Sequence, residues 1–366
     1  MLQDTSMSGS NGFPRILVLN ICHVGDVVMG TAALRLLRKL CPSAHITLKV
    51  PALSAGLMRL PELADEVIEE KKYKYKLLRS LDRTWCALKY RFARYDICFM
   101  LNNSKSDARR IKFLSNIPVR VCASMGFDGQ PCSAAAYATH VIPFDSVRNM
   151  HIVDYFQNII QGFFLHSPEK HVVFSREMTR IAEPAHRANL PAAPGQKRVA
   201  FCFEGSPINL NCWPEAYFVD LLGRVEKRGW YSYAAVPRDG TRYPKMLATQ
   251  GAKVDVFECA DITDCCAWLR EADLLISIDT AQVHLATAMG IPVISLGGST
   301  SSSTWPYSPS GVMLANSPGC FFCPFIDDCP DNLANGRRKK PDFIPPCMRT
   351  IMPDTVFAKA CEMLEK

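Results

Sequence analysis

Three polar side chains interrupt an otherwise apolar stretch of the sequence, and their spacing suits a phosphate-bearing ligand. Asp279 and Thr280 directly follow the apolar residues 274–278, and His284 comes about one helical turn later. A second apolar run, residues 291–296, then leads into a loop of Gly, Ser and Thr. Strand, polar turn, helix, strand and small-residue loop is how a parallel sheet builds a ligand crevice at the carboxyl ends of its strands. The pattern predicts a nucleotide or nucleotide-sugar site.

Each of these residues has a chemical role available to it. A hydroxyl and backbone N–H groups at a helix N-terminus suit a diphosphate, because the helix dipole favours anions there. His284 could donate to a phosphate or ribose oxygen, although a lone histidine on a helix is more often a half-buried structural residue. Ser299 and Thr300, in the loop after the second strand, would add hydroxyl contacts or remain solvated.

A similar unit stands near the start of the chain. Residues 15–21 are expected to form a strand, 22–26 a tight loop, 27–40 an amphipathic helix and 46–50 a second strand. Such a unit crosses over right-handedly into a parallel sheet. Asp26, in the loop, could remove a proton from an attacking hydroxyl. It could equally cap the following helix, as Asp commonly does, and the residues alone leave both roles open.

The elements divide the chain into two α/β domains. We expect a disordered tail at residues 1–13, a first domain at 14–183, a proline-rich linker at 184–196 and a second domain at 197–366, whose last helix packs back on the first. In the second domain, strands at 199–203, 231–236 and 254–257 alternate with helices at 214–228 and 265–271. Residues 69–94 are basic, aromatic and helical in pattern, and they precede a polar loop at 102–110.

Composition narrows the class of protein. Among 366 residues, 48% are apolar and 21% are charged, which is ordinary for a globular chain. The net charge is +7 and Lys and Arg occur along the whole chain, so anionic substrates or an anionic membrane surface are favoured over nucleic acid. Residues 1–14 lack a basic start and an apolar run, so the sixteen cysteines are expected to be reduced in a cytoplasm. No apolar run approaches the roughly 20 residues that span a bilayer, so membrane contact is expected to be peripheral.

Four motifs in order resemble one known family. They are RILVLNICHVGDVVMGTAALRLLR at residues 15–38, Trp213-Pro214, DTAQVHLA at residues 279–286 and a late Cys-x-x-Cys followed by Cys347-Met348. Spread over residues 15–357, they resemble the ADP-heptose:lipopolysaccharide heptosyltransferases, glycosyltransferase family 9. One departure stands at Asn211, where the family pattern usually places a Lys two positions before the Trp-Pro pair.

The resemblance implies a fold and a reaction. The fold is GT-B: two Rossmann-like, doubly wound parallel-sheet domains that face a central cleft, with the acceptor on the first and an ADP-sugar on the second. The reaction is inverting and needs no metal: a heptose passes from ADP-heptose to a lipopolysaccharide core or related glycan. Asp26 matches the general base, and Asp279, Thr280 and His284 match the residues that hold the nucleotide. The enzyme would be cytoplasmic and peripheral at the inner membrane, without a nucleic-acid partner.

Two alternatives remain beside this interpretation. One is a heptosyltransferase that modifies a protein, such as an autotransporter. The other is a nucleotide-sugar-binding protein with weak or no turnover, because without the Lys the leaving diphosphate lacks a cation. Arg238, Arg242 and Lys245 are the candidate replacements, and the neighbouring Asp239 could take the ribose hydroxyls or act as a turn residue.

The last candidate site is a group of late cysteines. Four thiolates could hold a structural zinc or iron ion, and the first pair has a familiar ligand spacing. The next gaps, of five and seventeen residues, are irregular for a zinc ribbon and favour unliganded thiols. The four are Cys320, Cys323, Cys329 and Cys347.

Overall fold

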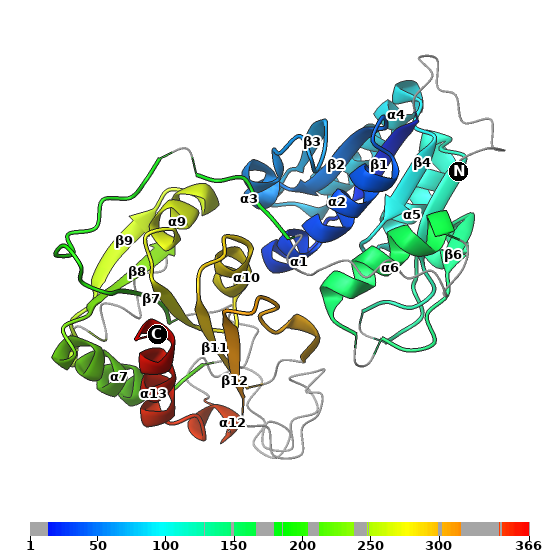
Figure 1. Ribbon diagram of the computed structural model, residues 1–366. Coiled ribbons are helices and arrows are strands. Elements are labelled where there is room, and N and C mark those ends of the chain that lie inside the picture. The colour runs from blue at the N-terminus through cyan, green and yellow to red at the C-terminus, as the bar shows by residue number, and fades with distance from the viewer. Residues whose placement is uncertain are drawn as a thin grey trace. The chain divides into compact units, whose positions relative to one another are not determined.

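The computed structural model describes most of the chain, which divides into two compact units between Ala182 and Glu183. Each unit is a six-stranded parallel sheet with helices on its faces (Figure 1). The division falls beside the proline-rich segment 184–196. The described residues are 14–127, 129–147, 150–165, 179–184, 186–203, 212–237, 247, 249–298, 302–315, 344 and 346–365. The expected tail at residues 1–13 lies outside them.

The first unit has the strand order β3-β2-β1-β4-β5-β6. Its strands are β1 (Arg15–Leu19), β2 (His45–Pro51), β3 (Glu66–Glu70), β4 (Ile97–Met100), β5 (Val119–Ala123) and β6 (His140–Ile142). Its helices are α1 (Val24–Met29), α2 (Thr31–Leu40), α3 (Ala52–Ala55), α4 (Lys76–Ala93), α5 (Lys105–Arg110) and α6 (Ile152–Leu165). The central strands β1 and β4 are apolar apart from Arg15 at the start of β1, because helices cover both faces of a parallel sheet.

The second unit has the order β12-β11-β10-β7-β8-β9. Its strands are β7 (Arg198–Cys202), β8 (Tyr231–Pro237), β9 (Asp255–Cys259), β10 (Leu274–Ile278), β11 (Val293–Gly297) and β12 (Gly311–Ala315). Its helices are α7 (Glu215–Lys227), α9 (Ile262–Leu269), α10 (Ala281–Ala288), α12 (Pro346–Arg349) and α13 (Pro353–Leu364). Both sheets therefore have the doubly wound order, and it reverses between β1 and β4 in one unit and between β7 and β10 in the other.

The start of the first unit differs from the expected single helix over residues 27–40. Two helices replace it: α1 begins three residues earlier, at Val24, and α2 begins at Thr31. Between them Gly30 brings the backbone against the sheet, where a Cβ atom would lie 2.5 Å from Nδ2 of Asn20. The earlier start places Asp26 inside the first turn of α1 rather than in a loop before it.

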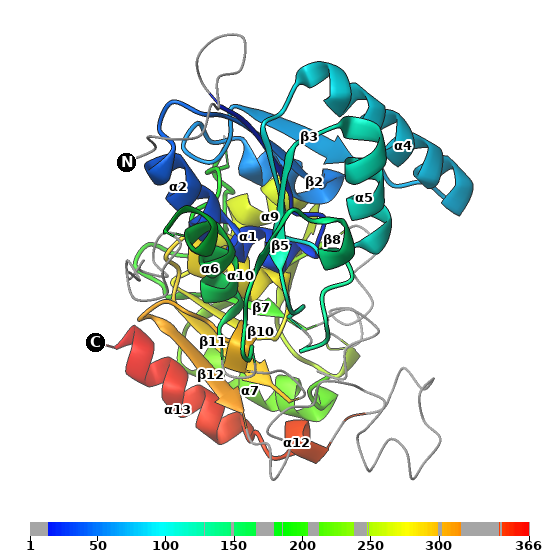
Figure 2. The ribbon, with the colours of Figure 1, turned by 90° about the vertical axis from the view of Figure 1, so that its right-hand side faces the viewer.

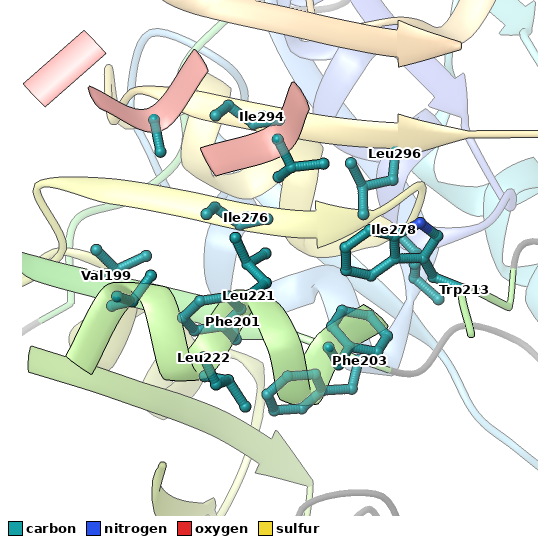
Figure 3. Close-up of a cluster of buried hydrophobic side chains, with 14 of the residues drawn as sticks. Val199, Phe201, Phe203, Trp213, Leu221, Leu222, Ile276, Ile278, Ile294 and Leu296 are labelled. Atoms are coloured by element: carbon teal, nitrogen blue, oxygen red, sulfur yellow. The ribbon is translucent and has the colours of Figure 1, made fainter. Parts of the chain in front are cut away.

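Trp213 anchors the core of the second unit (Figure 3). Its side chain is fully buried, and its indole N–H donates to the carbonyl of Ile351 over 2.9 Å. The last helix, α13, buries Val356 and Ala360 in the same core and contacts α7, β10 and β11. The apolar face of this helix is thus covered by the core of the second unit, and the expected contact with the first domain stays a prediction. No helix among the described residues is both long and apolar enough to cross a bilayer.

Candidate active site

Thr280 lies where the strand order of the second unit reverses. It is the N-cap of α10, in extended conformation, directly after β10 and Asp279. Its Oγ1 is 3.3 Å from Oγ of Ser277 and 3.7 Å from Sγ of Cys202, the last residue of β7. The Thr280 hydroxyl thus stands at the carboxyl ends of both β7 and β10. This edge is where open α/β sheets bind ligands.

The N-terminus of α10 is fixed in place, and no side-chain cap occurs there among the described residues. Gln282, in its first turn, donates from Nε2 to the carbonyl of Ala235 in β8 over 3.0 Å. The Thr280 hydroxyl makes no capping hydrogen bond to this helix. The first-turn N–H groups and the positive end of the helix dipole can therefore act on an anion at this edge of the sheet.

Asp279 and His284 are both almost buried, with exposed fractions of 7% and 6%. The backbone N–H of Asp279 donates to the carbonyl of Leu296 in β11 over 3.2 Å. The His284 ring lies nearly parallel to that of Tyr307, with planes 10° apart and centroids separated by 6.3 Å. No motif pointed to Tyr307, which lies in a Ser- and Pro-rich stretch. Because both side chains are almost buried, Asp279 and His284 also contribute to the packing of the second unit.

The remaining donor-site candidates follow β7, β8 and β11 along the sequence. Asn211, Arg238, Asp239, Arg242, Lys245, Ser299 and Thr300 lie outside the described residues. The described end of one loop is Gly298, where a Cβ atom would lie 2.7 Å from Sδ of Met348 and 3.0 Å from Sγ of Cys347. The Cys-Met pair of the fourth motif therefore packs directly against the backbone that follows β11.

The cysteine cluster falls mainly outside the described residues, which include Cys347 but not Cys320, Cys323 or Cys329. Among the residues that the structure does describe, no three His, Cys, Asp or Glu side chains gather as metal ligands would. A separate cleft of about 530 Å³ borders Arg198, Glu271 and Asp273. These residues lie at the amino ends of β7 and β10, so this cleft is at the opposite edge of the sheet from Thr280.

In the first unit, Asp26 follows β1 on the corresponding edge. The N-cap of α1 is His23, so Asp26 does not cap a helix that begins at Val27. Its partly buried carboxylate accepts a hydrogen bond from the backbone N–H of His23. Burial raises the pKa of Asp26, and the charge and N–H of His23 oppose that shift only in part. Burial and the charge of Asp26 together raise the pKa of the Cys22 thiol to about 12.

Two buried asparagines accompany Asp26 at this edge. Asn20 directly follows β1 and is fully buried. Neither Nδ2 nor Oδ1 of its side chain has a hydrogen-bond partner among the described residues. Asn102, two residues after β4, is 8% exposed, and its Oδ1 is likewise unpaired there. Leaving a buried amide unpaired costs about 1–3 kcal/mol. Buried polar side chains therefore lie where the strand order of the first unit reverses.

A buried ionic network lies beside these asparagines. Nζ of Lys49 is 2.8 Å from Oε2 of Glu70, and Arg83 pairs with both Glu70 and Asp107. Arg110 adds a third cation, 3.6 Å from Asp107. Although burial acts in the opposite direction, Lys49 and Arg83 lower the pKa of Glu70. No sequence motif indicated this network, because its members come from two strands and two helices.

Comparison with known proteins places the chain in a family. The model of glycosyltransferase family 9 (heptosyltransferase) matches residues 91–323, which is more than half of the chain. Lipopolysaccharide heptosyltransferase 1 of Pseudomonas aeruginosa is 30% identical over 139 residues, a match that spans 36% of this chain and only 38% of that relative. Asp26 lies before the range that the family model matches.

Solved structures show the same fold. A family 9 glycosyltransferase from Veillonella parvula superposes with a TM-score of 0.72 at 18% identity, covering 97% of this chain and 98% of that one. Escherichia coli heptosyltransferase WaaC with ADP-2-deoxy-2-fluoro heptose gives 0.66 at 17% identity, covering 95% and 99%. The two parallel sheets are the two Rossmann-like halves of the GT-B fold. Together, the family match and the fold show that this chain belongs to glycosyltransferase family 9, the heptosyltransferase family.

Proposed function

We propose that this protein transfers a heptose from ADP-heptose to a lipopolysaccharide core or related glycan acceptor, with inversion and without a metal. The observation that carries the proposal is the uncapped start of α10 at the point where the strand order of the second unit reverses, with the Thr280 hydroxyl beside it. Family membership and a relative named as a lipopolysaccharide heptosyltransferase support the choice of sugar and acceptor. The reaction would take place in the cytoplasm against the inner membrane surface.

The donor diphosphate would lie at the N-terminus of α10. The backbone N–H groups there and the Thr280 hydroxyl would donate to its oxygens, and His284 would donate to a phosphate or ribose oxygen. Strands β8 and β11 are parallel to β10 in the same sheet, so the loops after Pro237 and Gly297 begin at the same edge. Asp239 from one loop would take the ribose hydroxyls, and Ser299 and Thr300 from the other would add hydroxyl contacts.

The chemical step would be a single displacement at the anomeric carbon. An acceptor hydroxyl attacks that carbon, the bond to the diphosphate oxygen breaks, and ADP leaves with the electron pair. Asp26 takes the proton of the attacking hydroxyl, and its raised pKa makes it a stronger base than an exposed aspartate. Attack from the face opposite the leaving group inverts the configuration.

The leaving diphosphate also needs a positive partner, since Asn211 stands where the family pattern has Lys. The dipole of α10 supplies part of this charge. We propose Arg238, which directly follows β8, as the cation, with Arg242 and Lys245 as the next candidates. If this is correct, Arg238→Ala will lower the rate of ADP release far more than Lys245→Ala does.

Calorimetry with ADP tests the donor site. Thr280→Ala should weaken ADP binding by about tenfold or more, because a hydrogen bond to a charged group contributes about 1.5–3 kcal/mol. Thr287→Ala is the matched control: its hydroxyl lies in the same helix but donates to the carbonyl of Val283 over 2.7 Å, so ADP affinity should not change. Equal ADP affinity in the wild type and Thr280→Ala would refute the donor site.

Turnover separates an enzyme from a binding protein. With ADP-heptose and a lipopolysaccharide core acceptor, ADP should be released together with a heptosylated product. ADP-heptose binding without acceptor-dependent release of ADP would favour the nucleotide-sugar-binding alternative. Transfer to a protein acceptor alone would favour the protein heptosyltransferase.

A further inference from the structure

Helix α4 is held to its sheet by polar side chains. Arg83 pairs with Glu70 and Asp107, both of which are buried. Arg110 of α5 donates to Oγ of Ser80 over 2.8 Å and to Oγ1 of Thr84 over 3.2 Å. Two α4 side chains, Ala87 and Tyr90, are also buried on this side. These contacts fix which face of α4 points away from the sheet.

The opposite face of α4 is apolar and exposed. Its exposed fractions are 70% for Leu77, 57% for Leu81, 59% for Trp85 and 82% for Phe92, with Leu78 at 47% beside them. Spacings of four and seven residues bring these side chains to one side of a helix. A surface helix normally turns its apolar face to the core, so the amphipathic character of α4 is inverted. Figure 2 shows α4 at the outer margin of the first unit, next to α5.

The residues around this face carry a net positive charge, which favours an anionic partner. Residues 71–94 contain nine Lys or Arg and one Asp, so nine minus one gives a net charge of +8. Nζ of Lys89 lies 5.7 Å from the centroid of the Trp85 ring, and Nζ of Lys74 lies 5.8 Å from that of Tyr75. A second copy of the chain would bring the same positive charge to the contact. An anionic lipid surface would supply negative charge for the lysines and arginines and an apolar layer in which the exposed side chains of this face could be buried.

We infer that α4 is an interfacial helix that lies on an anionic bilayer. Leu77, Leu81, Trp85 and Phe92 would enter the boundary between headgroups and acyl chains, where aromatic rings are favoured. The lysines of the segment 71–76 would contact lipid phosphates. The inference rests on α4 and its flanks, so it does not depend on the proposed transfer reaction.

Sedimentation of the full chain with vesicles tests the inference. The protein should bind vesicles of phosphatidylcholine mixed with phosphatidylglycerol and bind phosphatidylcholine vesicles weakly. The double variant Leu81→Glu, Trp85→Glu should lower the partition constant by about tenfold or more. Leu53→Glu is the matched control, since Leu53 is 48% exposed in α3 of the same unit, and it should bind as the wild type does. Circular dichroism should show that both variants are folded, because the altered side chains are exposed.

Charge removal provides a second readout. Each substitution in the set Lys71→Gln, Lys72→Gln, Lys74→Gln should lower binding to anionic vesicles by roughly fivefold, with a smaller effect on neutral vesicles. Added salt should reproduce this loss. Equal vesicle binding by the wild type and the Leu81, Trp85 double variant would overturn the inference. The inference would also be overturned if the wild type formed a dimer and did not bind vesicles, and if the double variant were monomeric. A second copy of the chain would then cover this face. Release of ADP with a water-soluble acceptor should be unchanged in the double variant, so transfer and membrane contact are tested separately.

Discussion

Replacing Asp26 with Asn separates a catalytic carboxylate from a structural one. The substitution nearly keeps the side-chain volume, and it removes both the negative charge and the ability to accept a proton. A positioned general base contributes about 10²–10⁴ in rate, which corresponds to about 3–5 kcal/mol of activation free energy. We therefore expect kcat to fall by that factor while the affinity for ADP, which we propose binds at α10 in the other unit, stays the same.

The stability of Asp26→Asn should change in a direction that a capping role does not allow. The pKa of Asp26 is raised above 3.8 in the folded protein, so at pH values above the folded pKa the ionised carboxylate lowers the free energy of unfolding. The Asn variant should thus be at least as stable as the wild type at neutral pH. Its advantage should shrink as the pH falls toward 3.8 and both forms become neutral. A lost helix cap would instead cost about 1 kcal/mol at neutral pH.

The assay compares single-turnover release of ADP with urea unfolding, each over a range of pH. In the wild type, the acid limb of kcat/KM should lie above 3.8, the ordinary value for Asp. Asp65→Asn is the control: despite some burial, hydrogen bonds from Arg38 and from the N–H of Ile46 lower the pKa of Asp65, so this variant should lose stability and keep its rate. An unaltered kcat in Asp26→Asn would refute the catalytic assignment.

Three further substitutions test other parts of the structure. His284→Ala should weaken ADP binding by about tenfold without unfolding the protein, and unchanged calorimetric affinity would leave this histidine a structural role only. Gly298→Ala should cost about 1–3 kcal/mol in urea unfolding, because its Cβ would meet Sδ of Met348 at 2.7 Å; adding Met348→Ala should recover part of the loss specific to Gly298→Ala in a double-mutant cycle, and strict additivity would contradict the clash. Lys49→Met should cost about 3 kcal/mol near neutral pH, since it leaves the Glu70 carboxylate buried with one cation fewer. Because the pKa of Glu70 is lowered, the difference from the wild type should fade once the pH drops below the ordinary Glu value of 4.5, and a pH-independent difference would show that lost packing is its cause.

Local patterns in the sequence were sufficient for most of the fold. Largely apolar runs, interrupted only by Arg120 and Ser277, predicted the strands at 97–101, 119–123 and 274–278, because strands of a parallel sheet are mostly buried on both faces. The strand β12, Gly311–Ala315, was not predicted; its residues are only half-buried, and it follows a stretch rich in Ser and Pro. The start of α1 was placed three residues late, because His23 is not among the residues that usually cap helices.

The candidate site was only partly predictable, for a physical reason. Thr280 could be found because one local motif fixes both its strand and its helix. The partners of Lys49 could not, since Glu70 and Arg83 approach it only when separate elements pack together. The burial of Asn20 and its contact with Gly30 arise in the same way, from the close approach of α1 and α2 to the sheet.

The shared strand order has a consequence for how each unit folds. Within each half of a sheet, neighbouring strands also follow one another along the chain, but β1 pairs with β4 across 81 residues, as Ile16 does with Ile97. Closing the long loop between β1 and β4 costs more conformational entropy than any pairing within a half-sheet. We therefore expect the two half-sheets to form first and to join last at β1 and β4. Pulsed hydrogen exchange during refolding should then protect the amides of β1 facing β2 before those of β4 facing β1, and simultaneous protection would contradict this order. The junction at which the strand order reverses would thus be completed only in the final step of folding.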